Sequence, residues 1–247
     1  MVFIINWRDI QPKISHLSAV HWGGLREIDL ESEDETDPRN RLNVLNGFAR
    51  HALQGRKTSD FHKHETLEQV YYILSGAGEV LCGDKRYPVC EGDAVYLPAG
   101  VDHQMFNDAN EDWLIHHVVS QSVDGPGGEF AISNWRNIEP SVTGNGSIMW
   151  LQMGRVDSNC EVDILRSLNA ISREAIQPFG KVRARHSVSE EILYVIEGEG
   201  SFINGREKQR ISEGDMIHIP PRLKFDIINS GEGWLVYLVI SGGESLQ

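Results

Sequence analysis

Two histidines separated by one residue, His62 and His64, are the first residues whose types and spacing suggest chemistry. On a β-strand, residues i and i+2 point to the same side, so two imidazoles at this spacing can bind one metal ion. The chain has 10 histidines in 247 residues, and an isolated pair is more often an incidental surface feature than a ligand pair. A metal site therefore needs further donors from elsewhere in the chain.

A third histidine belongs to a motif of five residue types at fixed spacing. The motif reads Gly-x5-Pro-x-Gly-x2-His-x3-Asn and consists of Gly92, Pro98, Gly100, His103 and Asn107. Its glycines and proline predict turns on either side of a strand over residues 93–97, and a returning strand that begins at His103. The returning strand can bring a third imidazole to the first two.

The chain also repeats itself, which bears on how many domains must position these residues. Matching segments recur at offsets of 128 and then 122 residues: Asn6-Trp7-Arg8 with Asn134-Trp135-Arg136, Tyr72 with Tyr194, and Glu91-Gly92-Asp93 with Glu213-Gly214-Asp215. The offsets imply two copies of about 120 residues each, a length that suits two packed domains. We expect domains at residues 1–126 and 127–247, with the boundary near residues 125–128.

Within each copy the sequence is typical of β-structure. Residues 69–75, 93–98 and 113–120 are short, rich in β-branched and aromatic residues, and separated by Gly, Pro, Asp and Asn. No long helical periodicity occurs. We therefore predict an all-β fold of two small barrels side by side, because such chains must close or cover their sheet edges.

These motifs resemble those of the cupin superfamily, and the duplication makes the chain similar to a bicupin. The family signatures are G-x5-H-x-H-x3,4-E-x6-G and G-x5-P-x-G-x2-H-x3-N. The second is matched in full, whereas the first has Gly55 one residue too far upstream and its acidic ligand displaced or replaced. The resemblance implies a jelly-roll (double-stranded β-helix) barrel per copy, with one divalent transition metal ion (Fe, Ni, Mn, Cu or Zn) in its mouth.

The position of the family's glutamate ligand has two candidates. Six residues separate Gln69 from Gly76, and six residues likewise separate Glu191 from Gly198. Glu68 satisfies the shorter spacing and remains an alternative. With Gln69, the resemblance implies the metal ligands His62, His64, Gln69 and His103. Because a Gln carbonyl is neutral, this set would strengthen the pull of the ion on an anionic oxygen.

The second copy lacks most of these donors. At the matching positions it has Ala184, His186, Glu191 and Phe225. Too few ligands remain for a transition metal, so we expect an empty, structural barrel. An anion pocket at Arg183 or Arg185 is the alternative. Strand alternation predicts instead that both arginines face outward, to solvent or to a homodimer interface.

Other residues have weaker signals. His116 and His117 lie on one predicted strand, so one should face the barrel interior, where it could orient a ligand or move protons, and the other should face outward. Tyr71 shares the face of Gln69 and could bind a substrate, although a core role is the commoner one. We expect the remaining histidines to be structural: His16, His21, His51 and His218.

Composition excludes several classes of protein. Lys and Arg number 23 against 36 Asp and Glu, which gives a net charge of −13 and argues against nucleic acid and membrane surfaces as partners. No apolar run approaches the ~20 residues of a membrane span, and no secretory signal is recognisable. Cys82, Cys90 and Cys160 have no disulfide or zinc spacing, so we expect reduced thiols in a cytoplasmic protein. An acidic stretch from Glu27 to Asp37 is expected to be a solvated loop.

The resemblance implies a metal-dependent enzyme that acts on a small, oxygen-rich substrate such as an enol, a diketone, or a hydroxy or keto acid. A dioxygenase is preferred over a Lewis-acid isomerase, cyclase or lyase. The alternative is a non-catalytic bicupin that binds or senses a small ligand. Oxalate decarboxylase activity, which also occurs among bicupins, is not expected, because the glutamate ligand is in doubt and the second site is degraded.

Overall fold

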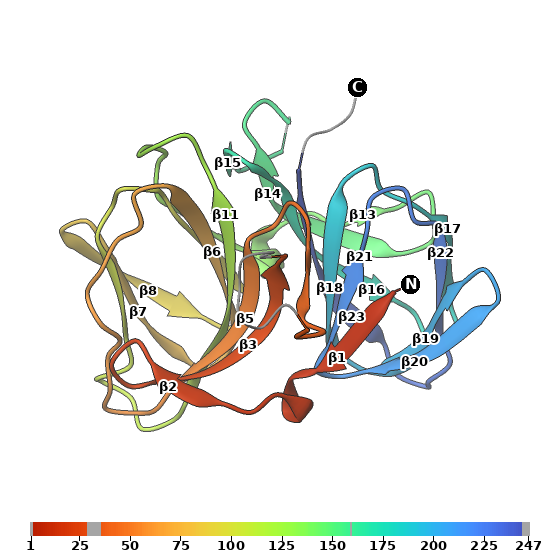
Figure 1. Ribbon diagram of the computed structural model, residues 1–247, viewed down its shortest axis with the longest axis horizontal. Helices are drawn as coiled ribbons and strands as arrows, with labels where there is room; N and C mark the ends of the chain where they lie inside the picture. The colour runs from red at the N-terminus through yellow and green to blue at the C-terminus, as the bar shows by residue number, and fades with distance from the viewer. Residues whose placement is uncertain (1, 29–35, 159, 244–247) are drawn as a thin grey trace.

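Two β-barrels lie side by side in the computed structural model, which describes residues 2–28, 36–158 and 160–243 (Figure 1). Each barrel has one large sheet, antiparallel except for one short parallel pair, and one small antiparallel sheet. The predicted all-β fold with two jelly-roll barrels is therefore confirmed. The two helices of the described residues have three residues each, far too short to cross a membrane.

The N-terminal barrel holds the predicted metal site. Its large sheet has the order β12-β9-β6-β11-β5-β3-β2, with β4 paired to β3, and its small sheet has the order β10-β7-β8. The large sheet comprises β2 (Lys13–Ser15), β3 (Ala19–Glu27), β4 (Asn40–Leu42), β5 (Gly47–Leu53), β6 (Leu67–Ser75), β9 (Asp93–Leu97), β11 (Leu114–Ser122) and β12 (Ala131–Asn134), and the small sheet comprises β7 (Ala77–Cys82), β8 (Lys85–Cys90) and β10 (His103–Phe106).

The C-terminal barrel repeats this plan. Its large sheet has the order β1-β21-β18-β23-β16-β14-β13, with β15 paired to β14, and its small sheet has the order β17-β22-β19-β20. The large sheet comprises β1 (Phe3–Asn6), β13 (Ser141–Val142), β14 (Ile148–Arg155), β15 (Asp163–Leu165), β16 (Leu168–Ile176), β18 (Glu190–Glu197), β21 (Asp215–Ile219) and β23 (Leu235–Gly242), and the small sheet comprises β17 (Lys181–Arg185), β19 (Glu199–Asn204), β20 (Glu207–Ser212) and β22 (Phe225–Asn229).

The two halves of the chain exchange their first strands. Strand β1 pairs with β21 of the C-terminal barrel, whereas β12, beyond the predicted boundary, pairs with β9 of the N-terminal barrel. The boundary near residue 126 stays a prediction, but each barrel contains a strand from the other half. The exchange adds many backbone hydrogen bonds between the halves.

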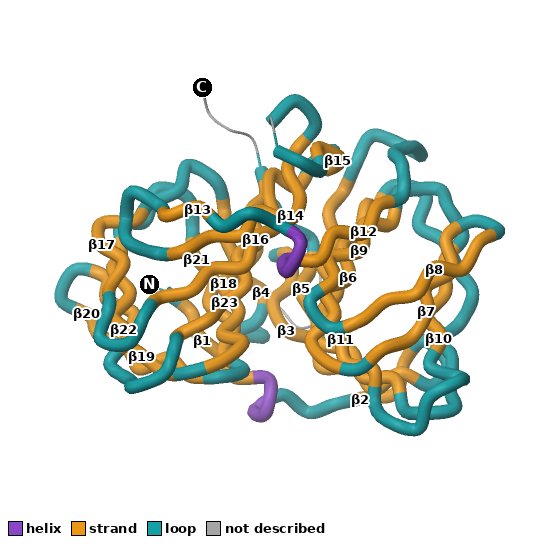
Figure 2. The backbone as a smooth tube through the Cα atoms, turned by 180° about the vertical axis from the view of Figure 1, so that it is seen from behind, coloured by secondary structure: helices purple, strands orange, loops and turns teal. Residues whose placement is uncertain are grey.

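The repeated Asn-Trp-Arg segment follows each exchanged strand and fastens it. The 3-10 helices η1 (Trp7–Asp9) and η2 (Trp135–Asn137) form there, where the two barrels meet (Figure 2). Asn6 Nδ2 donates to Asp215 Oδ1 at 2.8 Å, and Asn134 Nδ2 donates to Asp93 Oδ1 at 2.7 Å. The repeat is therefore an inter-barrel fastening rather than a binding motif.

Glycine is required at Gly92, the first residue of the predicted turn motif. Its φ of +92° is a conformation that L side chains rarely adopt, and a Cβ atom there would lie 2.6 Å from Trp135 Nε1. The motif then folds as predicted, since β9 begins at Asp93 and β10 begins at His103. The motif's glycine thus serves the exchange of strands as well as the turn.

The largest hydrophobic cluster lies between the two large sheets. It joins Phe48, Val70 and Tyr72 of the first barrel to Tyr194 and Leu238 of the second, and each barrel interior has a separate cluster of its own. Alternate residues of one strand therefore serve two cores. In β6, Val70 and Tyr72 belong to the inter-barrel core, whereas Tyr71 and Ile73 belong to the barrel interior.

Two buried carboxylates at equivalent positions hold the barrels together. Glu68 accepts hydrogen bonds from the backbone N–H groups of Arg166, Ser167 and Leu168 at 2.9, 2.7 and 2.6 Å. The equivalent Glu190 accepts them from residues 43–45 at 2.9 to 3.0 Å. Each carboxylate satisfies three consecutive donors that the interface would otherwise leave unpaired.

The acidic stretch is predicted to be a solvated loop, but the side chain of its last residue, Asp37, is not solvated. Residues 29–35 lie outside the described residues. Asp37, at the end of the stretch, is buried, and its carboxylate accepts hydrogen bonds from Arg39 Nε at 2.9 and 3.0 Å. Two guanidinium groups compensate its charge, because Arg26 Nη1 also lies 3.6 Å from Asp37 Oδ2.

Replacing Glu68 by Ala is expected to lower the free energy of unfolding by about 3 kcal/mol or more, because three backbone donors lose their acceptor inside the interface. Urea denaturation measures the change. Glu65→Ala, at an exposed residue paired with Lys63, is the control and should leave the free energy of unfolding nearly unchanged. Equal stability of the two variants would show that the Glu68 carboxylate does not fasten the barrels.

Acid should weaken the contact between Glu190 and residues 43–45. Burial raises the pKa of Glu190, but hydrogen bonds from His218 and from three backbone N–H groups outweigh burial and hold the pKa below its ordinary 4.5. Its contribution to stability is therefore present above pH 4.5 and is lost as the pH falls through the lower, folded-state pKa. Glu190→Gln should flatten the loss of stability below pH 4.5 in urea titrations. An unchanged slope would contradict this assignment.

Candidate metal site

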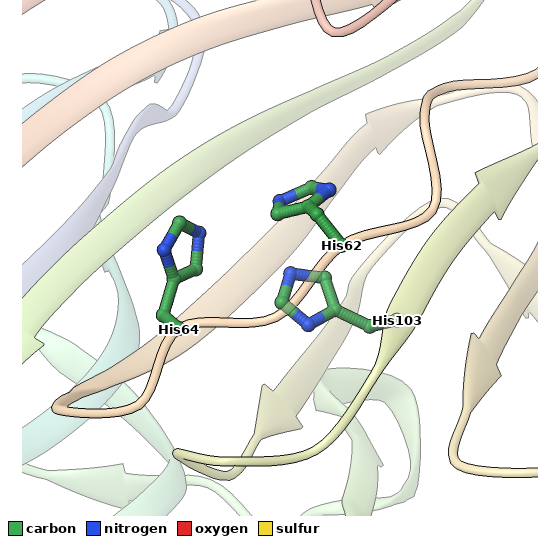
Figure 3. Close-up of side chains that lie close together, drawn as sticks. All are labelled: His62, His64 and His103. Carbon is green, nitrogen blue, oxygen red and sulfur yellow. The ribbon is translucent and has the colours of Figure 1, made fainter.

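The side chains of His62, His64 and His103 converge at one end of the N-terminal barrel (Figure 3). Their ligand atoms all lie within 4.8 Å of one another. His62 and His64 come from the segment before β6 rather than from a regular strand, and His103 begins β10. An isolated bridge fixes the two segments, because His103 N donates to His62 O at 2.8 Å and His62 N donates to His103 O at 3.2 Å.

Hydrogen bonds orient two of the three rings. His103 Nδ1 donates to the Val101 carbonyl at 3.1 Å, which leaves the Nε2 lone pair free, and this Nε2 is buried without a partner in the protein. His62 Nδ1 lies 3.4 Å from Asp60 Oδ1. Such contacts fix the tautomer of a metal-binding imidazole and leave its other nitrogen to the ion. The orphaned Nε2 of His103 is what a metal ion would satisfy.

Burial favours the neutral forms of two of these imidazoles, His103 and His64. It lowers the pKa of His103 to about 4, with smaller contributions from His62 and His64, and it lowers the pKa of His64, with help from His62. Because only the neutral ring binds a metal, protons do not compete for these nitrogens at physiological pH. The donor set fits a divalent transition metal ion.

Gln69 faces the cavity that His62 and His64 line, and Glu68 does not. Gln69 shares with His62 and His64 the wall of a cavity of about 270 Å³, and its Nε2 donates to Ser120 Oγ at 3.2 Å. Glu68, the alternative ligand, is on the opposite face of β6 and is fully buried in the inter-barrel contact. The structure excludes Glu68 because strand alternation turns it away from the barrel interior.

Three histidines that the sequence left as structural also line this cavity. They are His16, His21 and His51. Cross-strand pairing places His21, His51 and His116 next to one another on β3, β5 and β11, and such pairing cannot be read from spacing. The sequence contains one indication that histidines gather in the N-terminal barrel, because eight of the ten histidines fall within residues 16–117.

His116 and His117 partly follow the prediction. His116 faces the interior, where its ring centroid lies 5.1 Å from that of Tyr71. His117 faces away from the interior but not to solvent, because its ring packs 4.0 Å from Tyr194 across the inter-barrel core. One ring therefore faces inward and the other outward, as predicted, but the other barrel covers the outer face of β11, which the sequence did not indicate.

In the C-terminal barrel, Arg185 points inward rather than outward as predicted. A bulge in β17 between Val182 and Arg185, with Ala184 at φ +49°, shifts the alternation by one residue. Arg185 Nη1 donates to Glu174 at 2.7 Å, and Nη2 lies 3.5 Å from Glu191 Oε1. Arg183 is exposed as predicted.

Two carboxylates therefore already compensate Arg185, which argues against an anion pocket. Although burial lowers the pKa of Arg185, Glu191 and Glu174 raise it further, so the guanidinium stays charged. Glu191, the counterpart of Gln69, is thus engaged with an internal cation. At the other matching positions, His186 is exposed and Phe225 stacks on Phe202 at 4.8 Å.

Comparison with known proteins identifies related sequences and folds. The Cupin domain family matches residues 50–119 and 173–241. An oxalate-binding protein from Thermotoga maritima is 35% identical over 113 residues, 44% of this chain and 86% of that protein. Among solved structures, a glyoxylate-induced protein from Pseudomonas aeruginosa has a TM-score of 0.79 at 17% identity, over 100% of this chain and 91% of that one. A variant of oxalate decarboxylase from Bacillus subtilis has a TM-score of 0.73 at 15% identity, over 97% and 76%.

Replacing His64 by Ala should abolish tight binding of a divalent transition metal, because two imidazoles and one amide leave too few donors. Equilibrium dialysis with metal analysis measures the stoichiometry. His186→Ala, the equivalent substitution in the C-terminal barrel, is the matched control and should keep one ion per chain. The assignment fails if the two variants bind the same amount of metal.

Proposed function

The chain belongs to the cupin family, with two cupin domains, and we propose that it is a metal-dependent enzyme that acts on a small, oxygen-rich substrate in the N-terminal barrel. The observation that carries the proposal is the convergence of three imidazoles, two of which, His62 and His64, line a cavity of about 270 Å³. His62, His64, His103 and the Gln69 amide oxygen are the proposed ligands. Packing alone does not need a buried imidazole nitrogen without a partner.

The charge of this donor set favours anionic oxygen ligands. Three imidazoles and one amide carry no charge, so a divalent ion held by them keeps both of its positive charges. Enolates, diketones, hydroxy acids and keto acids present adjacent oxygens that suit such a centre. When bound, the ion would supply Lewis-acid activation and, if it were iron, reactivity toward dioxygen.

The side chains around the proposed ligands hold Gln69 in place. Tyr71 Oη donates to Gln69 Oε1 at 3.4 Å, while the Gln69 amide donates to Ser120. Burial raises the pKa of Tyr71, so its hydroxyl stays protonated and remains a donor. The two hydrogen bonds restrain both ends of the amide. Leu67 and Val118 add apolar surface to the cavity wall and help to exclude water.

The buried imidazoles of the cavity are poor bases in the free protein. Burial lowers the pKa of His116 to about 3 and that of His51 well below its ordinary value. Both rings are therefore neutral at pH 7, and each has a nitrogen lone pair that can accept a proton when a bound substrate supplies compensating charge. A proton leaving the substrate would thus find a neutral acceptor in His51 on the cavity wall, with His116 beside it.

Non-catalytic binding of a small ligand is the second candidate, and one comparison favours it. The Thermotoga maritima relative is an oxalate-binding protein. Decarboxylation of oxalate remains the weaker candidate, because the proposed ligand set has Gln69 in place of a glutamate and Glu191 is paired with Arg185. Cytoplasmic location stays a prediction from the sequence, consistent with free thiols at Cys82, Cys90 and Cys160.

We expect the iron-loaded protein to consume dioxygen with at least one member of a panel of enolisable keto acids and diketones. An oxygen electrode measures the uptake, and product analysis identifies the bond that is cleaved. His103→Ala should reduce the rate by at least about a hundredfold, because it removes one of three imidazole ligands.

The other outcomes separate the alternatives. Conversion of a substrate without oxygen uptake would replace the dioxygenase by a Lewis-acid isomerase, cyclase or lyase. Tight binding without conversion of any panel member would favour the non-catalytic module. Full activity of His103→Ala would exclude the metal from the mechanism and refute the proposal.

A further inference from the structure

A β-bulge in β3 turns Arg26 into the same cavity as His62 and His64. The register of β3 against β5 shifts between Gly23 and Leu25. Without the shift, alternation would place Arg26 on the face of Trp22, which packs against Trp7 between the barrels. With it, Arg26 joins His21 and Gly23 on the cavity wall, whereas Leu25 enters the inter-barrel core. Bulges of this kind re-aim side chains at functional sites.

His21 and Arg26 place two donors beside one small space. A Cβ atom on Gly23 would lie 3.4 Å from His21 Nε2 and 3.5 Å from Arg26 Nη2. Glycine therefore leaves open the space that both donors border. The Ser15 hydroxyl lies 3.2 Å from His21 Nδ1 and can donate to it, which leaves the hydrogen of His21 on Nε2, directed toward the cavity.

Cationic side chains lie near this space among the described residues. Lys13 lies opposite His21 in the register of β2 and β3. Arg26 and Arg39 both contact the carboxylate of Asp37. Burial, and to a smaller extent Lys13, His16 and Arg26, lower the pKa of His21 to about 4.

We propose that His21 Nε2 and the Arg26 guanidinium, on either side of Gly23, form a second subsite that binds the distal carboxylate of the substrate. A planar guanidinium and a neighbouring N–H donor suit the two oxygens of a carboxylate. The inference rests on the proposed function, because the other end of the same molecule would occupy the proposed metal site. The substrate is then a two-headed acid, with adjacent oxygens at one end and a carboxylate at the other.

The size of the cavity agrees with such a substrate. The same continuous cavity is bordered by His62, His64 and Gln69 at the proposed metal site and by His21 and Arg26 at the subsite. Its volume is about 270 Å³. This is more room than a two-carbon acid fills. The structure therefore favours a keto or hydroxy diacid with a longer chain.

Binding of matched ligand pairs to the zinc-loaded protein tests the subsite, since zinc has no redox chemistry. The probes are 2-oxo acids of four, five and six carbons, each with and without a terminal carboxylate, such as 2-oxoglutarate and 2-oxopentanoate. Titration calorimetry should show that the diacid of at least one length binds about tenfold more tightly than its monoacid. Equal affinities at every length, or no binding of any probe, would overturn the proposal.

Two variants locate the effect. Gly23→Ala places a methyl group between the two donors, and Arg26→Gln removes the charge. Both should abolish the preference for the diacid, while the affinity for the monoacid and the affinity for zinc stay within about twofold. Gly144→Ala, in the C-terminal half of the chain, is the control, because a Cβ atom there has no atom within 4 Å, and it should keep the preference. Thermal unfolding verifies that each variant is folded.

Zinc binding tests the proposed metal site, whereas the ligand pairs test the subsite, so the two can fail separately. A protein that binds no zinc refutes the proposed function. The same ligand pairs then decide the subsite in the metal-free protein, where a preference for the diacid that Gly23→Ala removes would support it. A preference that survives in both Gly23→Ala and Arg26→Gln would refute the subsite even if zinc binds.

Discussion

The alternation of side chains along β6 is the constraint on which the proposed site depends. Glu68 and Gln69 are neighbours in the chain, and the strand sends one into the contact between the barrels and the other into the barrel interior. A slip of one residue would take the Glu68 carboxylate away from three backbone donors and leave them buried without an acceptor. The inter-barrel contact therefore fixes the register that places a neutral amide, not a carboxylate, on the cavity wall with His62 and His64.

The two barrels use one scaffold for different interiors. Glu190 repeats the role of Glu68, and the exchanged strands are fastened by the same Asn-Trp-Arg segment in both halves. Inside the second barrel, however, Arg185 brings its own positive charge to Glu174 and Glu191. A guanidinium thus compensates the carboxylates where a metal ion would otherwise be required. The shared contacts maintain the fold, while the interiors are free to diverge.

Much of the fold and part of the site could be predicted from the sequence, because both depend on local spacing. The turns around Gly92 and Pro98 determine where β9 and β10 begin, and these strands bring His103 to His62 and His64. The features that were missed depend on contacts between distant strands or on bulges. Pairing of β3, β5 and β11 groups His21 with His51, and the bulge in β17 turns Arg185 inward.

Crystals of the protein purified without added metal, with anomalous diffraction recorded at the absorption edges of the first-row metals, test the central claim most directly. The account predicts one ion per chain, about 2.0–2.2 Å from a nitrogen of His62, His64 and His103, with the Gln69 amide oxygen as a further ligand. Three rings that point apart without an ion, or an ion held between His186 and Glu191, would contradict it.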